Sequence, residues 1–366
     1  MKNIVLVISS FNTGGAQRVL SIMANYWVKK DYNITFVTIS GGEVFYPLDE
    51  RINIVSLNLK SESKGIISAI KSNYIRVNEL KRTFQEINPD LIISFMITVN
   101  MISILAAKLA KKPIIISERN NPWKIEVQRY WKILQKYIFP ISNTLVVQTE
   151  RTKDFYRNYD LPIVTIHNPL DINKMNLNDI NIEEREKIIL GVGRLVDQKG
   201  FDTLIKAFSI LENKEEWKLI ILGEGKDRNK LERLIKELKI ENFVELPGTV
   251  KNVDEYMKKS SIFVLSSKYE GFPNVLAEAM AYGMAPISFN CDTGPSEIII
   301  NNKNGLLLET NDIDSLTISL QKLINNETLR IKLATNAINI SKSLSVSNIM
   351  NKWDNLINKI LKEINK

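Results

Sequence analysis

Short apolar segments alternate with longer segments of helical periodicity along almost the whole chain. The first two strand-like runs, at 4–8 and 34–39, enclose apolar residues at helical spacing over 16–29. Apolar strands between helices are typical of a parallel sheet that helices cover on both faces. The pattern begins again at 188, so we predict an α/β chain with two doubly wound, Rossmann-like parallel-sheet units. The expected strands are 4–8, 34–39, 52–57, 91–95, 114–117, 144–148, 163–166, 188–192, 217–222, 243–246, 262–265 and 285–289, and the expected helices are 16–29, 64–87, 100–110, 130–138, 201–211, 227–238, 253–258, 274–282, 313–324, 327–340 and 346–364.

A polar segment rich in Asn, Asp and Glu separates the two series of strands. The chain has 366 residues, enough for two domains at about 150 residues each. In open α/β sheets ligands bind at the carboxyl ends of the strands, so we expect functional motifs directly after strands and a cleft between the two units. The predicted domains are 1–170, a linker at 171–187, a second domain at 188–345 and a terminal helix at 346–366 that returns to the first domain.

The composition excludes several kinds of site. One cysteine, Cys291, and one histidine, His167, cannot form an intrachain disulfide or supply a zinc site, and they make a serine-hydrolase triad improbable. No apolar run is long enough for a membrane-spanning helix, and we expect a cytoplasmic protein. The net charge of +8 is compatible with phosphate-rich ligands, an anionic membrane or nucleic acid, and equally with a coding bias toward lysine.

Two glycines, Gly14 and Gly15, follow the first predicted strand. They let the backbone pass close to a ligand, and the helix after them offers unpaired N–H groups to an anion. An ordinary strand-to-helix turn would have the same residues, and the glycine spacing of dinucleotide-binding folds is absent. This turn alone therefore does not decide between the two interpretations.

A second turn, at 191–200, follows the first strand of the second half. It contains Gly191 and Gly193 and then two cations, Arg194 and Lys199. These cations are suited to neutralise a diphosphate without a metal ion. The alternative is a basic turn that only faces solvent.

The most specific motif lies at 269–281, where Glu270 and Glu278 flank the start of a helix. Gly271 permits an unusual backbone angle, Pro273 is suited to begin the helix, and the first N–H groups of the helix can bind phosphate. Carboxylates accept charge-assisted hydrogen bonds from hydroxyl pairs of sugars. One site of this kind could hold a sugar, a diphosphate and a ribose, whereas the alternative is two unrelated surface glutamates.

Together these motifs resemble the family 4 retaining glycosyltransferases of GT-B fold, over nearly the whole chain. The resemblance rests on the Glu-x7-Glu pair of 270 and 278, on Gly-Arg-Leu-x3-Lys-Gly at 193–200, and on the turns at 222–225 and 248–250. The segments 12–18 and 116–120 are most similar to enzymes that assemble polyprenyl-diphosphate-linked glycans. Those enzymes include bacterial N-acetylgalactosaminyltransferases of protein glycosylation and O-antigen pathways.

The resemblance implies a role for each matched residue. Glu270 would contact the donor sugar, Glu278 the ribose, and Arg194 and Lys199 the diphosphate, whose oxygen would take the proton of the acceptor hydroxyl without a metal or another cofactor. Several family members have histidine where Arg119 stands; arginine is no base at neutral pH, so positioning or charge stabilisation is expected there. The expected donor-binding residues are Gly14, Gly15, Arg194, Lys199, Glu224, Thr249, Val250, Glu270, Gly271, Phe272, Pro273, Asn274, Val275, Leu276 and Glu278. The expected acceptor-binding residues are Asn12, Thr13, Gly14, Glu118 and Arg119, and the expected catalytic residues are Arg194, Lys199, Glu270, Glu118 and Arg119.

The function implied is transfer of a sugar, such as N-acetylgalactosamine, from a UDP-sugar to a lipid-linked glycan. Aromatic and basic residues in 64–87 and 123–138 suit the inner face of an anionic membrane, although ordinary amphipathic helices would have a similar composition. No nucleic-acid partner is expected, because no binding motif accompanies the charge. We interpret Asp312 and Asp314 as helix-capping residues and not as a metal-binding pair. A GT-B-fold epimerase or hydrolase and a non-catalytic sugar-nucleotide-binding protein stay open as alternatives.

Overall fold

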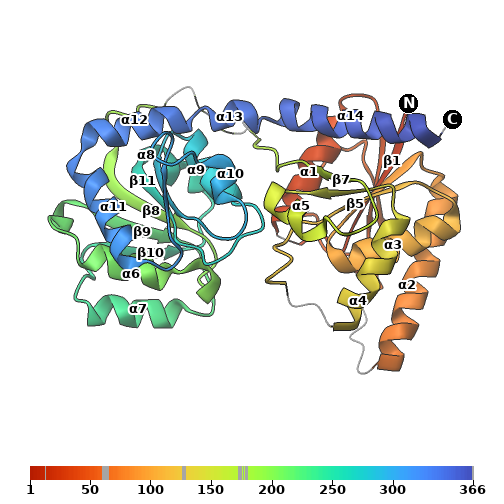
Figure 1. Ribbon diagram of the computed structural model, residues 1–366, viewed down its shortest axis with the longest axis horizontal. Coiled ribbons are helices and arrows are strands. Elements are labelled where there is room, and N and C mark those ends of the chain that lie inside the picture. The colour runs from red at the N-terminus through yellow and green to blue at the C-terminus, as the bar shows by residue number, and fades with distance from the viewer. Residues whose placement is uncertain are drawn as a thin grey trace. The chain divides into compact units, whose positions relative to one another are not determined.

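The computed structural model describes residues 1–12, 14–59, 66–125, 129–171, 175, 177 and 180–364. The chain divides into two compact units. Unit 1 consists of Met1–Pro169 together with Val346–Lys366, and unit 2 consists of Leu170–Ser345. Each unit contains a sheet with helices on both of its faces, as Figure 1 shows.

Unit 1 contains a seven-stranded sheet among the described residues, with the strand order β3-β2-β1-β4-β5-β6-β7 and parallel pairing throughout. Strand β4 is buried along its whole length, as expected for a strand in the middle of a sheet that helices cover on both faces. The strands are β1 Asn3–Ile8, β2 Asn33–Thr38, β3 Asn53–Ser56, β4 Leu91–Phe95, β5 Ile114–Ser117, β6 Thr144–Val147 and β7 Ile163–Thr165. The helices are α1 Gly15–Val28, α2 Ile66–Ile87, α3 Ile97–Ala110, α4 Arg129–Ile138, α5 Glu150–Tyr156 and α14 Val346–Ile364.

Unit 2 contains a six-stranded parallel sheet among the residues described, with the order β10-β9-β8-β11-β12-β13. The strands are β8 Glu186–Val192, β9 Lys218–Leu222, β10 Val244–Gly248, β11 Ser260–Leu265, β12 Ala285–Phe289 and β13 Leu306–Leu308. The helices are α6 Phe201–Ser209, α7 Arg228–Glu237, α8 Val253–Lys259, α9 Asn274–Ala281, α10 Pro295–Ile298, α11 Ile313–Asn325, α12 Glu327–Ala337 and α13 Ile340–Ser343.

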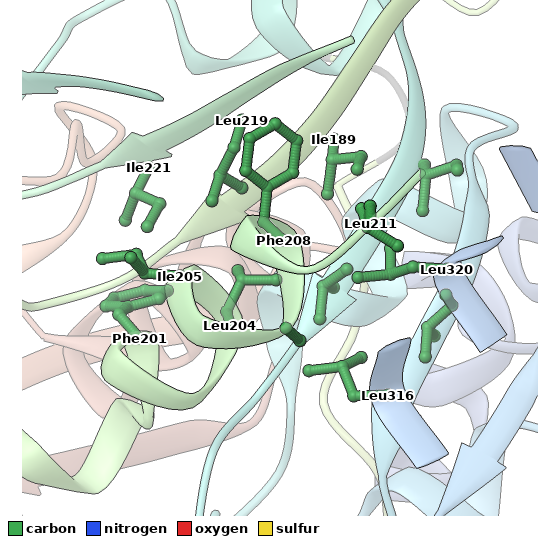
Figure 2. Close-up of a cluster of buried hydrophobic side chains, with 14 of the residues drawn as sticks. Ile189, Phe201, Leu204, Ile205, Phe208, Leu211, Leu219, Ile221, Leu316 and Leu320 are labelled. Carbon is green, nitrogen blue, oxygen red and sulfur yellow. The ribbon is translucent and has the colours of Figure 1, made fainter. Parts of the chain in front are cut away.

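The core of unit 2 forms where α6 packs on the sheet. Phe201, Leu204 and Phe208 recur at helical spacing, so they occupy one face of α6, and all three side chains are buried. Figure 2 shows this face directed toward Ile189 of β8 and Leu219 of β9. Burial of side chains of this size contributes about 1.5–3 kcal/mol each, which fixes the helix on the strands that precede the candidate site.

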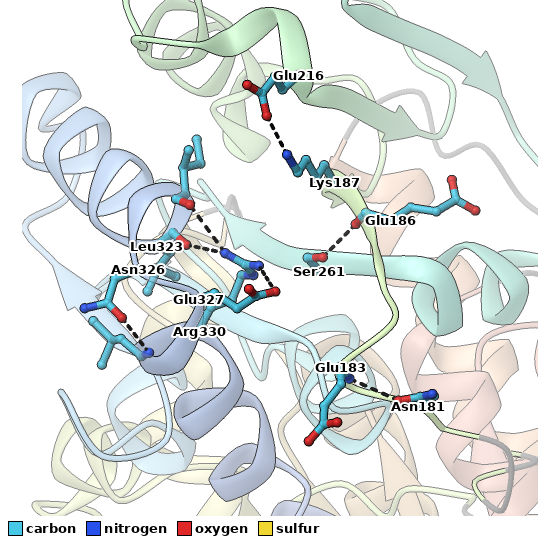
Figure 3. A network of polar contacts seen from close by, with 12 residues as sticks. Asn181, Glu183, Glu186, Lys187, Glu216, Ser261, Leu323, Asn326, Glu327 and Arg330 are labelled. Atoms are coloured by element: carbon cyan, nitrogen blue, oxygen red, sulfur yellow. Dashed lines mark hydrogen bonds and ion pairs between the residues drawn. The ribbon is translucent and has the colours of Figure 1, made fainter.

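A polar network fixes the corner between α11 and α12. Arg330 donates from Nη1 to the backbone oxygen of Leu323 at 2.7 Å and pairs with Glu327 at 3.1 Å (Figure 3). The arginine thereby satisfies a carbonyl in the last turn of α11 that has no partner within that helix. Lys187 and Glu216 form a second ion pair at 2.5 Å on the exposed surface of this unit.

Helix α14 belongs to unit 1, although it follows unit 2 in the sequence. Trp353 is completely buried and packs edge-on to Trp27 and stacked on Phe95. Asp354 accepts a hydrogen bond from Trp27 Nε1 at 2.8 Å and pairs with Lys30 at 2.9 Å. Both apolar and polar contacts therefore fix α14 against the rest of unit 1.

The fold class predicted from the sequence is confirmed, and each predicted strand is present. Of the α-helices and strands in the described residues, α5, α10 and β13 were missed, and the single helix predicted at 327–340 is divided into α12 and α13. Strand β8 begins at Glu186, inside the segment expected to be the linker. Asp312 accepts a hydrogen bond from the Ser315 N–H, as the capping interpretation requires. In the described part of the chain, no helix is both long and apolar enough to cross a membrane.

Candidate active site

The loops after β8 and β11 meet where the strand order of unit 2 reverses. These two strands are parallel neighbours, although β9 and β10 lie between them in the sequence. The loop after β8 contains 193–200, and the loop after β11 contains 266–273. At such a reversal in an open α/β sheet, the carboxyl ends of the strands border a ligand crevice. The topology thus brings the two most specific sequence motifs to one edge of the sheet.

Lys199 and Glu270 form an ion pair between these loops. Lys199 Nζ lies 2.6 Å from Glu270 Oε1, and the two side chains are only 15% and 10% exposed. A charge-assisted hydrogen bond is about twice as strong as a neutral one. The loops are also joined by Ser266 Oγ, which donates to the backbone oxygen of Lys199 at 2.8 Å, and by Gln198 Nε2, which donates to that of Tyr269 at 2.9 Å. The lysine and the carboxylate therefore have a fixed geometry.

Gly200 brings the loop after β8 close to the end of β11. Its φ is +59°, and a Cβ at this position would lie 2.2 Å from the backbone oxygen of Ser266. Only glycine has both the required backbone freedom and no side chain. The position of the neighbouring Lys199 therefore depends on glycine at 200.

The amino end of α9 follows Glu270 closely. Pro273 occupies its N-cap position, and no described side chain caps the first turn, which leaves N–H groups suited to an anion. Thr293 Oγ1 donates to the backbone oxygen of Glu270 and so anchors the turn before the helix. Glu278 lies half-buried about one turn after the start of α9.

The other residues predicted around α9 contribute in different ways. The side chains of Phe272 and Leu276 are 6% and 0% exposed, so they belong to the core and only their backbone groups are suited to a ligand. Gly271, Asn274 and Val275 are half-buried at the start of the helix. The predicted segment is thus placed beside the Lys199–Glu270 pair, but part of it serves packing.

Arg194 takes no part in this ion pair. Its side chain is exposed and forms no ion pair with any other residue that the structure describes. The preceding Gly193 donates its N–H to the backbone oxygen of Leu222 at 2.9 Å, which ties the loop after β8 to the end of β9. The predicted cation pair is therefore divided into a paired Lys199 and an exposed Arg194.

The loops after β9 and β10 lie against the loop after β8. Gly223 donates its N–H to the backbone oxygen of Gly248 at 2.8 Å, and Leu195 donates to that of Glu224 at 2.9 Å. Gly223 has φ +136°, and a Cβ there would lie 1.9 Å from the backbone oxygen of Gly193. These contacts bring the predicted donor-site turns at 222–225 and 248–250 to the same edge as 193–200.

Glu224 is held by a residue that the sequence motifs did not include. Arg228 donates from Nη1 to Glu224 Oε1 at 2.7 Å and from Nη2 to the backbone oxygen of Leu246 at 2.8 Å. The available signal for this pair was the Glu-x3-Arg spacing between the turn at 222–225 and the start of the predicted helix at 227–238. Of the other residues predicted here, Thr249 is exposed and Val250 is half-buried.

In unit 1, the turn after β1 places two predicted residues at the start of α1. Gly14 is the N-cap residue, in extended conformation, and Gly15 begins the helix. The first turn contains no acidic residue and no described side chain that caps it, so its N–H groups are suited to an anion. Asn12 is exposed before this turn, and Thr13 lies outside the described residues.

Glu118 and Arg119 are buried directly after β5. Asn100 of α3 donates to Glu118 Oε1 at 2.7 Å and accepts a hydrogen bond from Ser94 at 2.7 Å. Arg119 donates from Nη1 to Asn168 Oδ1 at 2.7 Å. Burial raises the pKa of Glu118 to about 8 and lowers that of Arg119 to about 9, in spite of the attraction between the two charges.

The Arg119 side chain lies against aromatic rings. Its guanidinium carbon is 4.1 Å from the ring centroid of Phe95 and 5.9 Å from that of Trp353, distances typical of cation–π contacts. Its Nε and Nη2 atoms are buried and lack a hydrogen-bond partner among the described groups. Buried donors without a hydrogen-bond partner are rare in folded proteins. Sequence reasoning missed the supporting residues Asn100, Asn168 and Trp353.

Sequence comparison places both units in known families. The family described as Glycosyltransferase Family 4 matches residues 13–174, and the family described as Glycosyl transferases group 1 matches residues 174–340. A Campylobacter jejuni relative is 30% identical over 98% of both chains. It is named GalNAc-alpha-(1->4)-GalNAc-alpha-(1->3)-diNAcBac-PP-undecaprenol alpha-1,4-N-acetyl-D-galactosaminyltransferase.

Solved structures have the same fold. A glycosyltransferase from Rickettsia africae superposes with a TM-score of 0.82 at 19% identity and covers 99% of both chains. HepE from Anabaena, in complex with UDP and glucose, superposes with a TM-score of 0.82 at 17% identity over 98% of this chain and 100% of HepE. The two Rossmann-like units form a GT-B fold, and the chain belongs to the family 4 glycosyltransferases.

Proposed function

We propose that the protein is a retaining glycosyltransferase that moves a sugar from a UDP-sugar to a glycan carried by a polyprenyl diphosphate. Its family supports the transferase class. The name of the Campylobacter relative mentions an undecaprenol-linked glycan, which supports the proposed class of acceptor. The same name mentions an N-acetylgalactosaminyl group, which supports an N-acetylhexosamine as the donated sugar. The UDP in the HepE structure supports a uridine nucleotide.

The observation that carries the proposal is the shielded Lys199–Glu270 pair beside the uncapped amino end of α9. In the proposed complex, Glu270 accepts hydrogen bonds from hydroxyls of the donor sugar. The N–H groups of α9, Lys199 and the exposed Arg194 bind the diphosphate and stabilise its charge as it leaves. Glu278 holds the ribose, and Glu224, Thr249 and Val250 lie nearer the base. We propose that these cations make a metal ion or another cofactor unnecessary.

The proposed reaction needs orientation rather than a nucleophile from the protein. The acceptor oxygen bonds to the anomeric carbon while the bond from that carbon to the diphosphate oxygen breaks. The departing diphosphate oxygen takes the acceptor's proton on the same face of the sugar, so the anomeric configuration is retained. Fixed charges that meet the developing negative charge supply the stabilisation.

We propose that Asn12, Gly14, Glu118 and Arg119 bind the acceptor. Thr13, for which the same role was predicted, lies outside the described residues. The two buried N–H donors of Arg119 that lack a protein partner among the described residues support this role. Arg119 retains its proton at neutral pH, since even its lowered pKa is about 9. In the proposed complex it serves positioning and charge stabilisation, and not proton abstraction.

We further propose that the protein works in the cytoplasm at the inner face of an anionic membrane. Helix α4 supports this contact because it exposes Tyr130, Ile133 and Tyr137 to 41%, 54% and 73%, next to the exposed Lys132 and Lys136. Apolar side chains between lysines are suited to the headgroup region of anionic lipids.

A donor screen with a membrane lipid extract, followed by mass spectrometry of the glycolipids, tests the function. We expect one UDP-sugar to add a single mass increment to a polyprenyl-diphosphate glycan. The anomeric signal of the product, measured by NMR, must match the donor's configuration. Donor consumption that does not depend on lipid would favour an epimerase or hydrolase. Donor binding without transfer to any acceptor would favour a non-catalytic protein.

A further inference from the structure

A cavity of about 350 Å³ opens between α4, α5 and the loop after β5 in unit 1. Its walls are mainly the side chains of Ile97, Trp123, Ile125, Phe155, Tyr156 and Tyr159. We call it the aromatic cavity. Its volume is within the range of small-molecule sites, which is about 300–1,000 Å³.

The walls of the aromatic cavity are mostly apolar, and their aromatic rings pack against one another. Trp123 packs edge-on to Phe155 with ring centroids 5.1 Å apart, and Tyr156 packs edge-on to Tyr159 at 5.2 Å. The buried amide of Gln135 donates to Tyr156 Oη at 3.2 Å, so these two polar groups are paired with each other. Apolar surface without a partner favours an apolar occupant over water.

The rim of the aromatic cavity is positively charged. Lys132 and Lys136 line it one helical turn apart, both with exposed side chains, and no acidic residue belongs to the described lining. Arg151 lies over the Trp123 ring at 5.2 Å and adds a third cation. An apolar interior below three cations is complementary to a hydrocarbon chain that ends in phosphate.

The aromatic cavity is close to the candidate acceptor residues. Trp123 and Ile125 are on the same loop that begins with Glu118 and Arg119 after β5. Burial and, next, the charge of Glu118 raise the pKa of Tyr159, so this wall lies within electrostatic reach of that carboxyl group. A chain bound here would keep its polar end near the residues proposed to bind the acceptor.

We propose that the aromatic cavity binds the isoprene units next to the diphosphate of a polyprenyl diphosphate, and that Lys132 and Lys136 contact its phosphates. The proposed function supplies the identity of this chain, and the inference rests on that function to this extent. The cavity shares Lys132 and Lys136 with the exposed face of α4 proposed to contact the membrane, but its apolar lining consists of other residues. The face would contact many lipids, whereas the cavity selects a single chain.

Calorimetric titration of the full chain with farnesyl diphosphate, in buffer without detergent, tests this proposal. We expect Ile125→Trp, which fills the cavity from a half-buried loop position, to weaken binding about tenfold or more. Ile318→Trp is the matched control, because it makes the same change at an exposed position on α11 of unit 2, and its affinity should equal that of the unaltered chain. Phe155→Ser is a second cavity variant, and thermal unfolding reports whether each variant is folded.

The head group and the chain are tested separately. The Lys132→Gln, Lys136→Gln variant should lose about tenfold or more in affinity for farnesyl diphosphate and nothing for farnesol. Pyrophosphate that binds as tightly as farnesyl diphosphate, or binding that neither folded cavity variant weakens, would overturn the proposal. Equal affinity for dodecyl diphosphate would overturn the assignment to an isoprenoid.

The outcomes also separate this proposal from the proposed function. If farnesyl diphosphate binds as expected but no nucleotide sugar is transferred to any lipid glycan, the cavity assignment stands and the proposed function fails. If transfer occurs equally well in Ile125→Trp and that variant binds the probe normally, the cavity assignment fails and the function stands.

Discussion

Lys199 and Glu270 form an ion pair that is largely shielded from water. We predict that Glu270→Gln and Lys199→Met each lower kcat/KM by about 10²–10³, because each removes a fixed charge from the proposed donor site. The double variant should be hardly worse than either single one, since the two groups act as a unit. Steady-state kinetics with the identified donor measure this. Asp197→Asn, which breaks the neighbouring pair with Lys268, is the control and should change little.

Arg194 differs from Lys199 because it is exposed and has no ion-pair partner among the described residues. Arg194→Ala should therefore leave the free energy of unfolding within about 0.5 kcal/mol of its original value. Turnover should fall by about 10²–10³ if the arginine meets the leaving diphosphate. Urea denaturation and kinetics on the same sample separate the two effects. Unchanged turnover would remove Arg194 from the site.

Glu118 gives the protein a defined pH dependence. Burial raises its pKa from 4.5 to about 8, so between these values the folded chain keeps a proton that the unfolded chain has lost. The free energy of unfolding should therefore fall as pH rises through this window, by at most about 1.4 kcal/mol per pH unit, and level off above it. In Glu118→Gln, the free energy of unfolding, measured by denaturation at several pH values between 4.5 and about 8, should lack this fall. Glu86→Gln, at an exposed carboxylate of α2, should retain it.

At the scale of elements, α14 stabilises unit 1 mainly through Trp353. This side chain is fully buried between Trp27 and Phe95 and lies over the Arg119 guanidinium. Trp353→Ala should cost about 3–5 kcal/mol, as large-to-small changes of buried aromatic residues do. Urea denaturation measures this cost, and hydrogen exchange should accelerate in α1 and β4 but not in the strands of unit 2. Lys352→Ala, at the exposed residue before Trp353, is the control. Equal stability of the two variants would contradict the prediction.

Elements with a strong periodic pattern were predictable from the sequence, and short or distant relationships were not. The apolar runs of β1 and β4 could hardly form anything but buried strands. Helix α5 has only seven residues, too few for an apolar period to be recognised, and β13 has three. The motifs also indicated Lys199 and Glu270 as site residues. Their direct contact was not predictable, because the two residues are 71 positions apart and only the strand order brings them together. The contact of Trp353 with Arg119 had no local signal at all.

At the scale of the whole molecule, each unit has its own sheet, its own core and its own candidate binding residues. Unit 2 contributes fixed charges at the reversal of its sheet, which suit a nucleotide diphosphate. Unit 1 contributes buried polar groups after β5 and, on the same loop, the wall of an apolar cavity. This division of charge and apolar surface corresponds to the two substrates proposed, one water-soluble and one lipid-linked.

The net charge of +8 and the exposed apolar residues of α4 lead to the last prediction, which concerns vesicle binding. The protein should bind vesicles of anionic phospholipid more tightly than zwitterionic ones, because each lysine near the surface contributes about 1 kcal/mol. High salt should weaken this binding, since the Debye length falls from about 8 Å at 0.15 M to about 3 Å at 1 M. In a sedimentation assay, Ile133→Ser should lower the bound fraction. The control Ile318→Ser, at an even more exposed position on α11 of unit 2, should leave it unchanged. Equal loss in the two variants would mean that α4 is not the contact surface, and equal binding to both vesicle types would mean that the positive charge does not select the membrane.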